Sequence, residues 1–466
     1  METIIQQITI ELVEKITKKA SGEELGDLDA LAAVIFEDCA EAARLILQEV
    51  IRLRNLEFRA DKAFRKEKGL VLKEKDRPRQ ILTKLGMIEW ERDYYYDKAS
   101  GQFLYPLDHM LGIRSYERIG DEVTAQLLNR ASEVSYARST DIVTGGQVSR
   151  QSVRDHLLKA EIPQAQPAEE GRKVRELHLY ADEDHAPLQK PGKKHGKQSQ
   201  SVPLVTVTEG TRKAGTGRNR TISPMHFADE DLSTKQLWSS VEGYIERAYD
   251  IEGIEHIYIH ADAGNWIRNG LDGFSQVIHV MDGYHFEKEM KKVAKKYPVR
   301  NVRIAIRNAL KADDRKSAEE FLLSLPDADE ELQRFRTYLF GNWEAIRNRV
   351  TLDVPGSCTE GQVSHVLSER LSRNPLGWSR KGLGKMSKLR VYRCNGGKLT
   401  GKDMKPGEDQ ECYREYAERF LKEQLQGALD WSIFEPARPI MDGSYGTQVL
   451  MRYYGTDIGM VGNAVS

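Results

Sequence analysis

Residues 254–282 decide the fold, because they contain two apolar runs that each end in an aspartate. The first run, IEHIYIHAD, covers 254–262, and the second, QVIHVMD, covers 276–282. Short runs rich in β-branched and aromatic residues are typical of buried strands. Two earlier runs, VRELHLYAD at 174–182 and SVPLVTVTE at 201–209, have the same character. Helical stretches lie between and after these runs, so the pattern predicts a mixed α/β domain around a central sheet.

Three of the four expected strands end in or just before a carboxylate, namely Asp182, Asp262 and Asp282. In open α/β sheets, ligands bind outside the carboxyl ends of the strands. One aspartate at a strand end is more often a helix cap, but several together suit a hard cation such as Mg²⁺, which prefers oxygen ligands. Asp184 lies two residues after Asp182 on the same face of its strand, so spacing alone does not choose between them.

A further acidic position lies far downstream in the segment PGSCTEGQVSH, residues 355–365. Ser357 or Thr359 can cap the helix that starts here, and Glu360 falls near its first turn. Taken alone, Glu360 would be a carboxylate that interacts favourably with the helix dipole.

Two basic segments accompany these acids, although the whole chain has a formal net charge of −1. Residues 370–395 hold eight cations and no acid, and residues 190–220 hold eight cations against Glu209 alone. The cations are Arg370, Arg373, Arg380, Lys381, Lys385, Lys388, Arg390 and Arg393 in the first segment, and Lys190, Lys193, Lys194, Lys197, Arg212, Lys213, Arg218 and Arg220 in the second. Either segment alone could be a solvated loop. Both together favour a phosphodiester substrate, because phosphate neutralisation supplies most of the affinity for nucleic acid.

The chain before residue 174 has a different organisation. We expect a helical N-terminal region over 1–78, with a break around 22–29. Residues 79–105 alternate and contain a turn at KASGQ, which predicts an aromatic β-hairpin; such a hairpin can bind nucleic acid but more often packs. The hairpin and a helix-turn-helix-like stretch form a DNA-binding region over 79–165, followed by a polar linker at 161–173.

The helix-turn-helix pattern consists of a helix over 136–143, a turn at Gly145-Gly146 and a second helix that Ser149 can cap. Arg150, Gln151 and Arg154 would project from the first turns of that second helix, where a recognition helix meets base edges and phosphates. The same geometry also occurs in ordinary helical bundles, so the pattern leaves both interpretations open.

Several classes of protein are excluded. The four cysteines are far apart and form no CxxC pair, which excludes a disulfide scaffold and disfavours structural zinc. No apolar run approaches the roughly 18 residues of a membrane span. The phosphate-binding pattern GxxxxGK[ST] is absent from the sequence, which disfavours an ATPase.

Four motifs resemble those of a known family. They are HLYADEDH (178–185), HADAGNWI (260–267), MDGYHF (281–286) and GSCTEGQVSHVLSERLSRNPLGWS (356–379). They look like the motifs of bacterial insertion-sequence transposases of the ISLre type (uncharacterised protein family 0236), and the resemblance spans nearly the whole chain.

The resemblance implies a DDE transposase whose ribonuclease-H-like catalytic domain, over 174–400, carries a helical insertion at about 285–345. Carried over by motif, Asp182, Asp262 and Glu360 would be the catalytic triad and hold two Mg²⁺ ions, with Mn²⁺ as a possible substitute. The family pattern favours Asp182 over Asp184. Asp282 and His285 look like the C/DxxH motif of Mutator-like and hAT relatives and would support the active site. Residues 401–466 would form a separate C-terminal region.

The implied partners are transposon terminal inverted repeats and target DNA, bound by a homo-oligomer in the bacterial cytoplasm, at the nucleoid and without a membrane. Beside the active site, the DNA backbone would be held by Arg373, Arg380, Lys381, Lys385 and Lys388. Two alternatives remain. One is a ribonuclease-H-like nuclease without strand transfer, and the other is a transposon-derived DNA-binding protein without activity.

Overall fold

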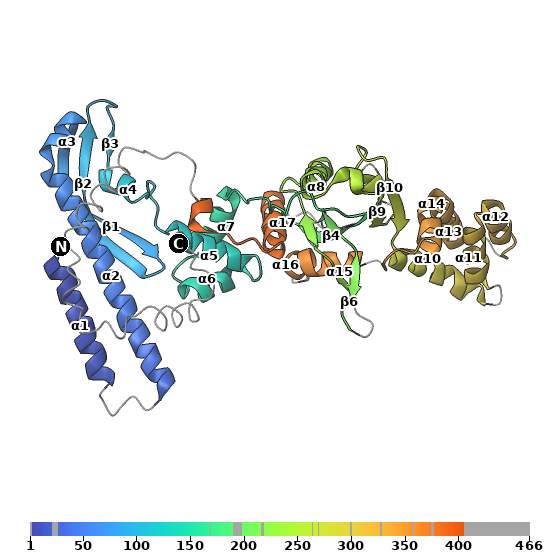
Figure 1. Ribbon diagram of the computed structural model, residues 1–466, viewed down its shortest axis with the longest axis horizontal. Helices are drawn as coiled ribbons and strands as arrows, with labels where there is room; N and C mark the ends of the chain where they lie inside the picture. Colours follow the sequence, from blue (N-terminus) through green and yellow to red (C-terminus); the bar gives the residue numbers. More distant parts are fainter. Residues whose placement is uncertain are drawn as a thin grey trace. The chain divides into compact units, whose positions relative to one another are not determined.

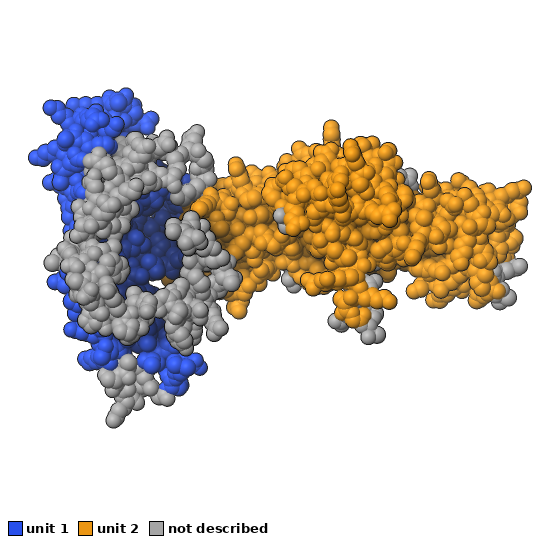
Figure 2. All heavy atoms as spheres, viewed as in Figure 1, with its two compact units in different colours: residues 1–120, 406–466 blue, residues 121–405 orange. Residues whose placement is uncertain are grey.

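The computed structural model describes residues 2–20, 27–167, 169–189, 198–215, 219–262, 264–268, 270–298, 301–326, 329–356, 358–373 and 377–404. The described chain forms two compact units, residues 1–120 and residues 121–404 (Figure 2). The C-terminal region expected at 401–466 lies, from residue 405 on, outside the described residues.

The first unit begins with two long helices, α1 (Glu2–Ala20) and α2 (Leu28–Ala60), which pack against each other (Figure 1). Asp27 caps α2 by accepting the backbone N–H of Ala30 at 2.8 Å. Lys15 and Lys19 of α1 both pair with Asp38 of α2, so charge as well as apolar contact joins the two helices. A short helix α3 (Lys62–Glu67) leads into the strands.

A three-stranded antiparallel sheet follows, made of β1 (Leu70–Thr83), β2 (Gly86–Asp97) and β3 (Phe103–Leu104), with α4 (Pro106–Met110) after it. The turn expected at KASGQ joins β2 to β3. The turn between Thr83 and Gly86 and the strand β1 before it were not predicted, and β1 occupies the end of the region 1–78 that was expected to be helical. The middle of β1 is charged and exposed, so it lacks the apolar alternation that marks a strand.

The second unit begins with α5 (Asp121–Ala131), α6 (Tyr136–Thr144) and α7 (Arg150–Lys159), which contact one another. Gly145 and Gly146 have φ values of +57° and +80°, which only glycine adopts without strain, and they make the turn between α6 and α7. These helices were expected to form one region, 79–165, with the hairpin. In the structure they belong to the unit of the large sheet, because α7 packs on a later helix, α17 (Arg380–Cys394).

The large sheet has five strands in the order β10-β9-β4-β5-β8. Their bounds are β4 (Glu176–Pro187), β5 (Ser199–Thr208), β8 (Met225–Phe227), β9 (His256–Ala261) and β10 (Val277–Met281). β5 is antiparallel to both of its neighbours, whereas β9 and β10 run parallel to β4. This order and these directions are those of the ribonuclease-H fold, which confirms the predicted fold class. The strands β6 (Thr211–Lys213) and β7 (Asn219–Thr221) form a separate small ribbon.

Each face of the large sheet is covered by helices. On one face, residues such as Leu179, Val207 and Ile259 form an apolar core with α8 (Thr234–Ala248). Against the other face lie the segments after the insertion, with α15 (Thr359–Val363) and α16 (Glu369–Leu371) on β4 and α17 on β5 and β8. A π-helical turn (Ser364–Ser368) joins α15 to α16. Short helices at Ile251–Gly253, Asn265–Arg268 (α9) and Gly401–Met404 complete the unit.

The helical insertion has an apolar core of its own. It comprises α10 (Gly283–Lys296), α11 (Val302–Ala312), α12 (Arg315–Leu323), α13 (Glu330–Gly341) and α14 (Trp343–Thr351). Phe286, Met290, Ile306 and Leu339 are among its buried side chains. The insertion leaves the sheet directly after β10 and returns just before α15, so it separates β10 from the segment of Glu360.

Candidate active site

The register of the large sheet aligns Asp182, Asp262 and Asp282. β4 pairs in parallel with β9 up to Ala181 opposite Ala261, and β9 pairs with β10 up to Ala261 opposite Met281. In each of the three strands, the next residue is the aspartate. The three carboxylates therefore follow one another across adjacent strands at the carboxyl edge of the parallel part of the sheet, where ligands bind in such folds.

Asp182 differs in one respect from the expectation, because it does not end its strand. β4 continues to Pro187, and its partner there is β5, with Asp182 opposite Leu204 and Pro187 opposite Ser199. The polar residues after Asp182 hid this extension, since they interrupt the apolar run that marks a buried strand. Asp182 therefore pairs with β5 on one side, whereas β9 on the other side ends one residue earlier.

The carboxyl group of Asp182 is in an unfavourable electrostatic environment. Its pKa is raised to about 6, mainly by burial and also by the nearby Asp262 and Asp282, while the Glu183 backbone N–H and His285 act in the opposite direction. The Glu183 N–H donates to Asp182 at 2.8 Å. Negative charge is therefore concentrated at this edge, and a cation placed there would lower the pKa of Asp182.

Asp282 and His285 form a hydrogen-bonded pair at the start of α10. Asp282 is 3% exposed and accepts the backbone N–H of His285 at 3.2 Å, which caps the helix. The Nδ1 atom of the His285 ring lies 2.8 Å from the same carboxylate oxygen. This hydrogen bond raises the pKa of His285, and the charges of Asp182 and Asp262 act in the same direction. His285 is therefore a potential cation beside the carboxylates.

Asp262 and Glu360 are both exposed. The Asp262 carboxylate accepts the backbone N–H of Gly264 at 2.9 Å. Glu360 lies in the first turn of α15, and α15 packs against β4, the strand of Asp182. The structure thus brings Asp182, Asp262, Asp282 and His285 together and places Glu360 on a neighbouring element. Among the described residues, no three His, Cys, Asp or Glu side chains are arranged as a metal-binding group.

Asp184 has a different environment from Asp182. It is 7% exposed, and its Oδ1 atom accepts hydrogen bonds from the hydroxyl groups of Ser368 at 3.0 Å and Ser372 at 2.9 Å. These bonds connect β4 to the segment after α15. The geometry therefore gives Asp184 a structural contact and leaves Asp182 beside Asp262.

A row of buried rings lies on the same face of the sheet as Asp182, and the sequence analysis did not identify it. Tyr258, His178, His260 and Tyr180 stack in turn, with ring centroids 5.1, 5.4 and 4.9 Å apart. His178 Nδ1 lies 3.1 Å from His260 Nε2. Burial lowers the pKa of His178 to about 4 and that of His260 to about 3, so both are neutral at pH 7. The two-residue period of HLYAD and YIHAD was the available signal.

Two residues of the insertion also lie beside the acidic edge. The hydroxyl of Tyr338 on α13 is buried, and its pKa is raised by burial and by the charges of Glu289, Asp262 and Asp282. The Arg349 side chain on α14 lies against Gly283, and its Nη1 donates to the carbonyl of Pro355 at 3.1 Å. No local pattern could have identified either residue, because only the folded insertion brings them near the sheet.

The residues expected to read DNA on α7 are accessible. Arg150, Gln151 and Arg154 are all exposed, and Ser149 caps the helix by accepting the N–H of Ser152 at 3.1 Å. Arg154 pairs with Asp155 at 2.9 Å on the surface, where such pairs contribute little stability.

The five cations of the basic segment 370–395 that were expected to hold DNA have different environments. Arg373, Arg380 and Lys381 are exposed. Lys385 and Lys388 instead pair with Glu230 at 3.0 and 3.4 Å. The remaining three are also engaged within the fold, Arg370 with the carbonyl of Ala131, Arg390 with Glu369 and Arg393 with the carbonyl of Gly397. In the second segment, Lys190, Lys193, Lys194, Lys197 and Arg218 lie outside the described residues.

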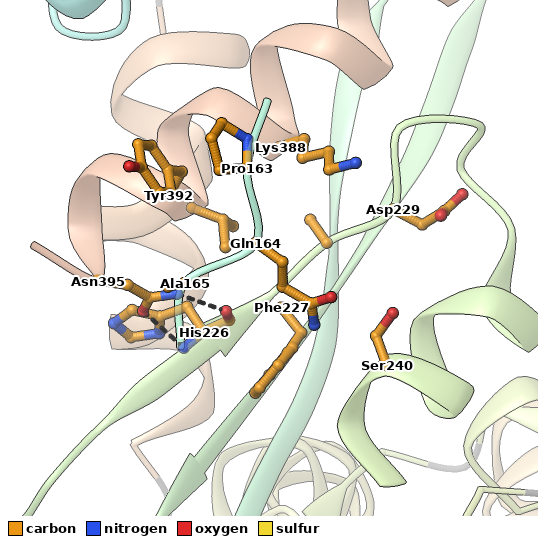
Figure 3. Close-up of a pocket in the computed structure, with 12 residues that line it drawn as sticks. Pro163, Gln164, Ala165, His226, Phe227, Asp229, Ser240, Lys388, Tyr392 and Asn395 are labelled. Carbon is orange, nitrogen blue, oxygen red and sulfur yellow. Dashed lines mark hydrogen bonds between the residues drawn. The ribbon is translucent and has the colours of Figure 1, made fainter. Parts of the chain in front are cut away.

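A cavity lies between α17, β8 and the linker residues 163–165 (Figure 3). Asn395 closes one side of it by donating to the His226 carbonyl and accepting the His226 N–H, both at 2.8 Å. The residues that line this cavity do not include Asp182, Asp262, Asp282 or Glu360, so the cavity is separate from the candidate active site. Within the described ranges, no helix is long and apolar enough to cross a membrane.

Comparison with known proteins gives one family. The family model described as "Uncharacterised protein family (UPF0236)" matches residues 23–408. A UPF0236 protein of Caldanaerobacter subterraneus subsp. tengcongensis, whose name joins eleven serial designations, is 36% identical over 367 residues, 77% of this chain and 75% of that protein. A second UPF0236 protein of that organism is 35% identical over 413 residues, 85% of each chain. Among solved structures, the Drosophila P element transposase strand transfer complex aligns with 70% of this chain and 86% of that chain, at 10% identity and a TM-score of 0.20.

Proposed function

The chain belongs to the uncharacterised protein family UPF0236, and from this premise and the site geometry we propose that it is a DNA transposase of the DDE type. It would bind transposon ends and catalyse metal-dependent strand cleavage and strand transfer. The observation that carries the proposal is the register that aligns Asp182, Asp262 and Asp282 at one edge of a ribonuclease-H-like sheet. Carboxylates in such an arrangement suit phosphodiester chemistry assisted by metal ions.

Magnesium is the cofactor in this proposal, and the carboxylates at the edge of the sheet support it. Mg²⁺ is usually held by one or two protein carboxylates, with water and substrate phosphate completing its shell. Asp182 and Asp262 offer two such carboxylates, and the pKa of Asp182 is raised by burial and by the charges of Asp262 and Asp282, which a bound cation would counteract. In the proposal, Asp182, Asp262 and Glu360 hold two Mg²⁺ ions, for which Mn²⁺ is a substitute. Bound there, the ions would stabilise the attacking and leaving oxygens of an in-line displacement.

The other residues of the site have supporting roles in the proposal. Asp282 orients the His285 ring through the 2.8 Å contact, and His285, when protonated, offsets the charge of Asp182 and Asp262. A protonated imidazole at this position can also donate a hydrogen bond to a phosphate oxygen.

DNA binding is assigned to two surfaces. Arg150, Gln151 and Arg154 on α7 would contact the terminal inverted repeats, because they are exposed on the second helix of a helix-turn-helix arrangement. The exposed cations Arg373, Arg380 and Lys381 would contact the backbone beside the active site. A homo-oligomer on DNA is proposed as well, since two transposon ends must act together.

The names of the relatives are consistent with a protein encoded by a mobile genetic element. One relative's name joins eleven designations within one organism, and another's joins four. One protein that recurs under many designations in a single organism is what copying of a mobile element would produce.

The experiment is a joint assay of cleavage and joining. A labelled duplex from the flanking ends of the element is incubated with the full chain, a supercoiled target plasmid and Mg²⁺ or Mn²⁺. The expected products are ends with a free 3′-OH and plasmid joined to labelled DNA, both absent with Asp262→Asn. Cleavage of any duplex without joining would establish a nuclease instead. Specific binding of the ends without cleavage in either metal would establish a DNA-binding protein.

A further inference from the structure

The first unit carries a row of aromatic rings that the proposed function does not use. Tyr105, Tyr94, Phe103 and Tyr96, here called the hairpin aromatic row, are in sequential contact. Ring centroids are 4.8 Å apart for Tyr105 and Tyr94, 5.2 Å for Tyr94 and Phe103, and 5.0 Å for Phe103 and Tyr96. Tyr94 and Phe103 are nearly parallel, at 13°. Tyr94 and Tyr96 lie on β2, Phe103 lies on β3 and Tyr105 is the residue after β3.

These rings are on the outer side of the sheet and are not part of the core. Side chains alternate between the faces of a strand, and Tyr95, which lies between Tyr94 and Tyr96, is 1% exposed and packs on Phe58 of α2. Phe103, by contrast, is 53% exposed. Tyr94, Tyr96 and Tyr105 are partly buried, so Phe103 is the exposed member of the row. Exposed apolar surface of this kind is typical of a binding surface.

Cations lie against the rings along the row. The ammonium group of Lys73 is 5.5 Å from the centre of the Tyr96 ring, the guanidinium of Arg77 is 4.8 Å from Tyr94, and that of Arg92 is 3.5 Å from Tyr105. Each distance is within the range of a cation–π contact. Rings and cations therefore alternate along one surface.

Two of these cations oppose each other directly, since Arg77 of β1 is the register partner of Arg92 of β2. Like charges in directly opposite positions destabilise a sheet. Burial lowers the pKa of Arg92 to about 10, and the neighbouring Arg79 and Arg77 contribute. Arg92 pairs with Asp108, and Arg77 pairs with Glu74 at 3.0 Å, which leaves Lys73 and Arg79 as additional positive charge. Glu74 and Asp108 already offset this repulsion, and an anion bound at this surface would offset it further.

We propose that the hairpin aromatic row, with Lys73 and Arg77, is a binding site for single-stranded DNA. Bases would stack on Phe103 and Tyr96, and the phosphates would contact the two cations. Such a combination of stacking rings and positive charge is how proteins bind single strands without sequence preference. A duplex could use the cations but not the rings, because its base faces are already stacked. The binding site does not depend on the proposed function, which supplies only the source of the strand, at cleaved ends.

The test measures binding without catalysis. The full chain carries Asp262→Asn, divalent metal is removed, and fluorescence anisotropy follows an end-labelled oligothymidine of about 15 nucleotides. Phe103→Ser should raise the Kd about tenfold, as expected when one base no longer stacks, whereas Phe103→Trp should retain the affinity. The Kd for a blunt duplex of the same length should change little. Lys73→Met should lower the dependence of log Kd on log salt by about 0.7.

A matched control is available within the same unit. Tyr116 is 94% exposed and lies outside the row, so Tyr116→Ser removes an exposed ring without touching the proposed site. Equal Kd values for Phe103→Ser and Tyr116→Ser would overturn the proposal, as would an oligothymidine that does not bind the parent chain at micromolar concentration. A fall in thermal midpoint for Phe103→Ser as large as that for Tyr95→Ala would also overturn it, because the ring would then be packing.

Failure of this site and failure of the proposed function give different results. A chain that binds oligothymidine through Phe103 but never cleaves element ends has the site and lacks the transposase activity. A chain that cleaves and joins ends, with Phe103→Ser unchanged in oligothymidine affinity, has the activity and lacks the site.

Discussion

The aspartate edge of the large sheet and the basic segment 370–395 each concentrate charge of one sign, and the fold treats them differently. At the edge, Asp182 lies beside Asp262 and Asp282, and burial, together with repulsion from these two carboxylates, raises the pKa of Asp182. In the basic segment, most cations have partners. Glu230 pairs with two lysines, and Glu369 pairs with Arg390.

The difference shows how to separate functional charge from structural charge. A cluster of like charges that is not neutralised within the fold costs stability, and it is retained where a ligand of opposite charge completes it. A cluster whose members have partners contributes to packing and specificity, whatever its density in the sequence. By this criterion the aspartate edge is the stronger candidate for a site.

The largest expected effect is on catalysis. Glu360→Gln should reduce cleavage of element ends by roughly a hundredfold to a thousandfold or more, the scale on which removal of a charge-stabilising group acts. Glu360 is exposed, so the thermal midpoint should be unchanged. The measurement is single-turnover cleavage with saturating Mg²⁺, and Glu369→Gln, in the same downstream segment, is the control. Normal cleavage by Glu360→Gln would remove it from the triad and restrict the site to the aspartate edge.

The next effect is on stability and concerns two arginines three residues apart. Arg370 is 4% exposed, donates to the carbonyl of Ala131 at 2.8 Å and lies over the rings of Tyr136 and Trp378. Arg370→Ala should lower the free energy of unfolding by about 2–4 kcal/mol, since it leaves a cavity and removes both ring interactions. Arg373→Ala, which removes an exposed side chain, should change it by less than about 0.5 kcal/mol. Chemical denaturation measures both. Equal effects would contradict the division of the basic segment into buried and exposed cations.

The sequence predicted four of the five strands of the large sheet because buried strands are continuous apolar runs. The short strand β8 was not predicted, and Asp182 lies within β4 rather than at its end. The cap of Ser149 and the glycine turn before it followed from local rules as well. The partner of Lys385 could not be predicted, because Glu230 lies 155 residues away along the chain. The same reason applies to the hydrogen bond between Asp184 and Ser368, 184 residues away, which distinguishes Asp184 from Asp182.

A smaller effect follows from the pKa of Asp182, which folding raises from 3.8 to about 6. Ionising this carboxyl group is harder in the folded chain, so its contribution to stability is fully present below pH 3.8 and is lost as the pH rises through about 6. Asp182→Asn removes that cost and should stabilise the metal-free protein at pH 8 by roughly 1–3 kcal/mol, with no gain at about pH 4. Urea unfolding at both pH values measures this.

Added Mg²⁺ provides a second test of the charge on Asp182. Millimolar Mg²⁺ should raise the thermal midpoint of the parent chain at about pH 8 more than that of Asp182→Asn, because the variant lacks one of the carboxylates that would bind the ion. A variant that is less stable than the parent at this pH without metal would show that the charge of Asp182 is neutralised within the fold. The aspartate edge would then resemble the basic segment.

The smallest effect concerns DNA affinity and tests which cations of the basic segment are free. Arg380 and Lys381 are exposed at the start of α17, whereas Lys385 and Lys388 share Glu230. Changing Arg380 and Lys381 together to Ala should weaken binding of specific and random duplexes about equally. The slope of log affinity against log salt should fall by roughly one unit for each phosphate that is no longer neutralised.

Changing Lys385 and Lys388 to Ala should leave this slope unchanged and instead lower the thermal midpoint, because Glu230 is then left without both lysines. A reversed pattern, with the slope set by Lys385 and Lys388, would mean that DNA displaces Glu230 from these lysines, and the pairing would then be a feature of the DNA-free state alone.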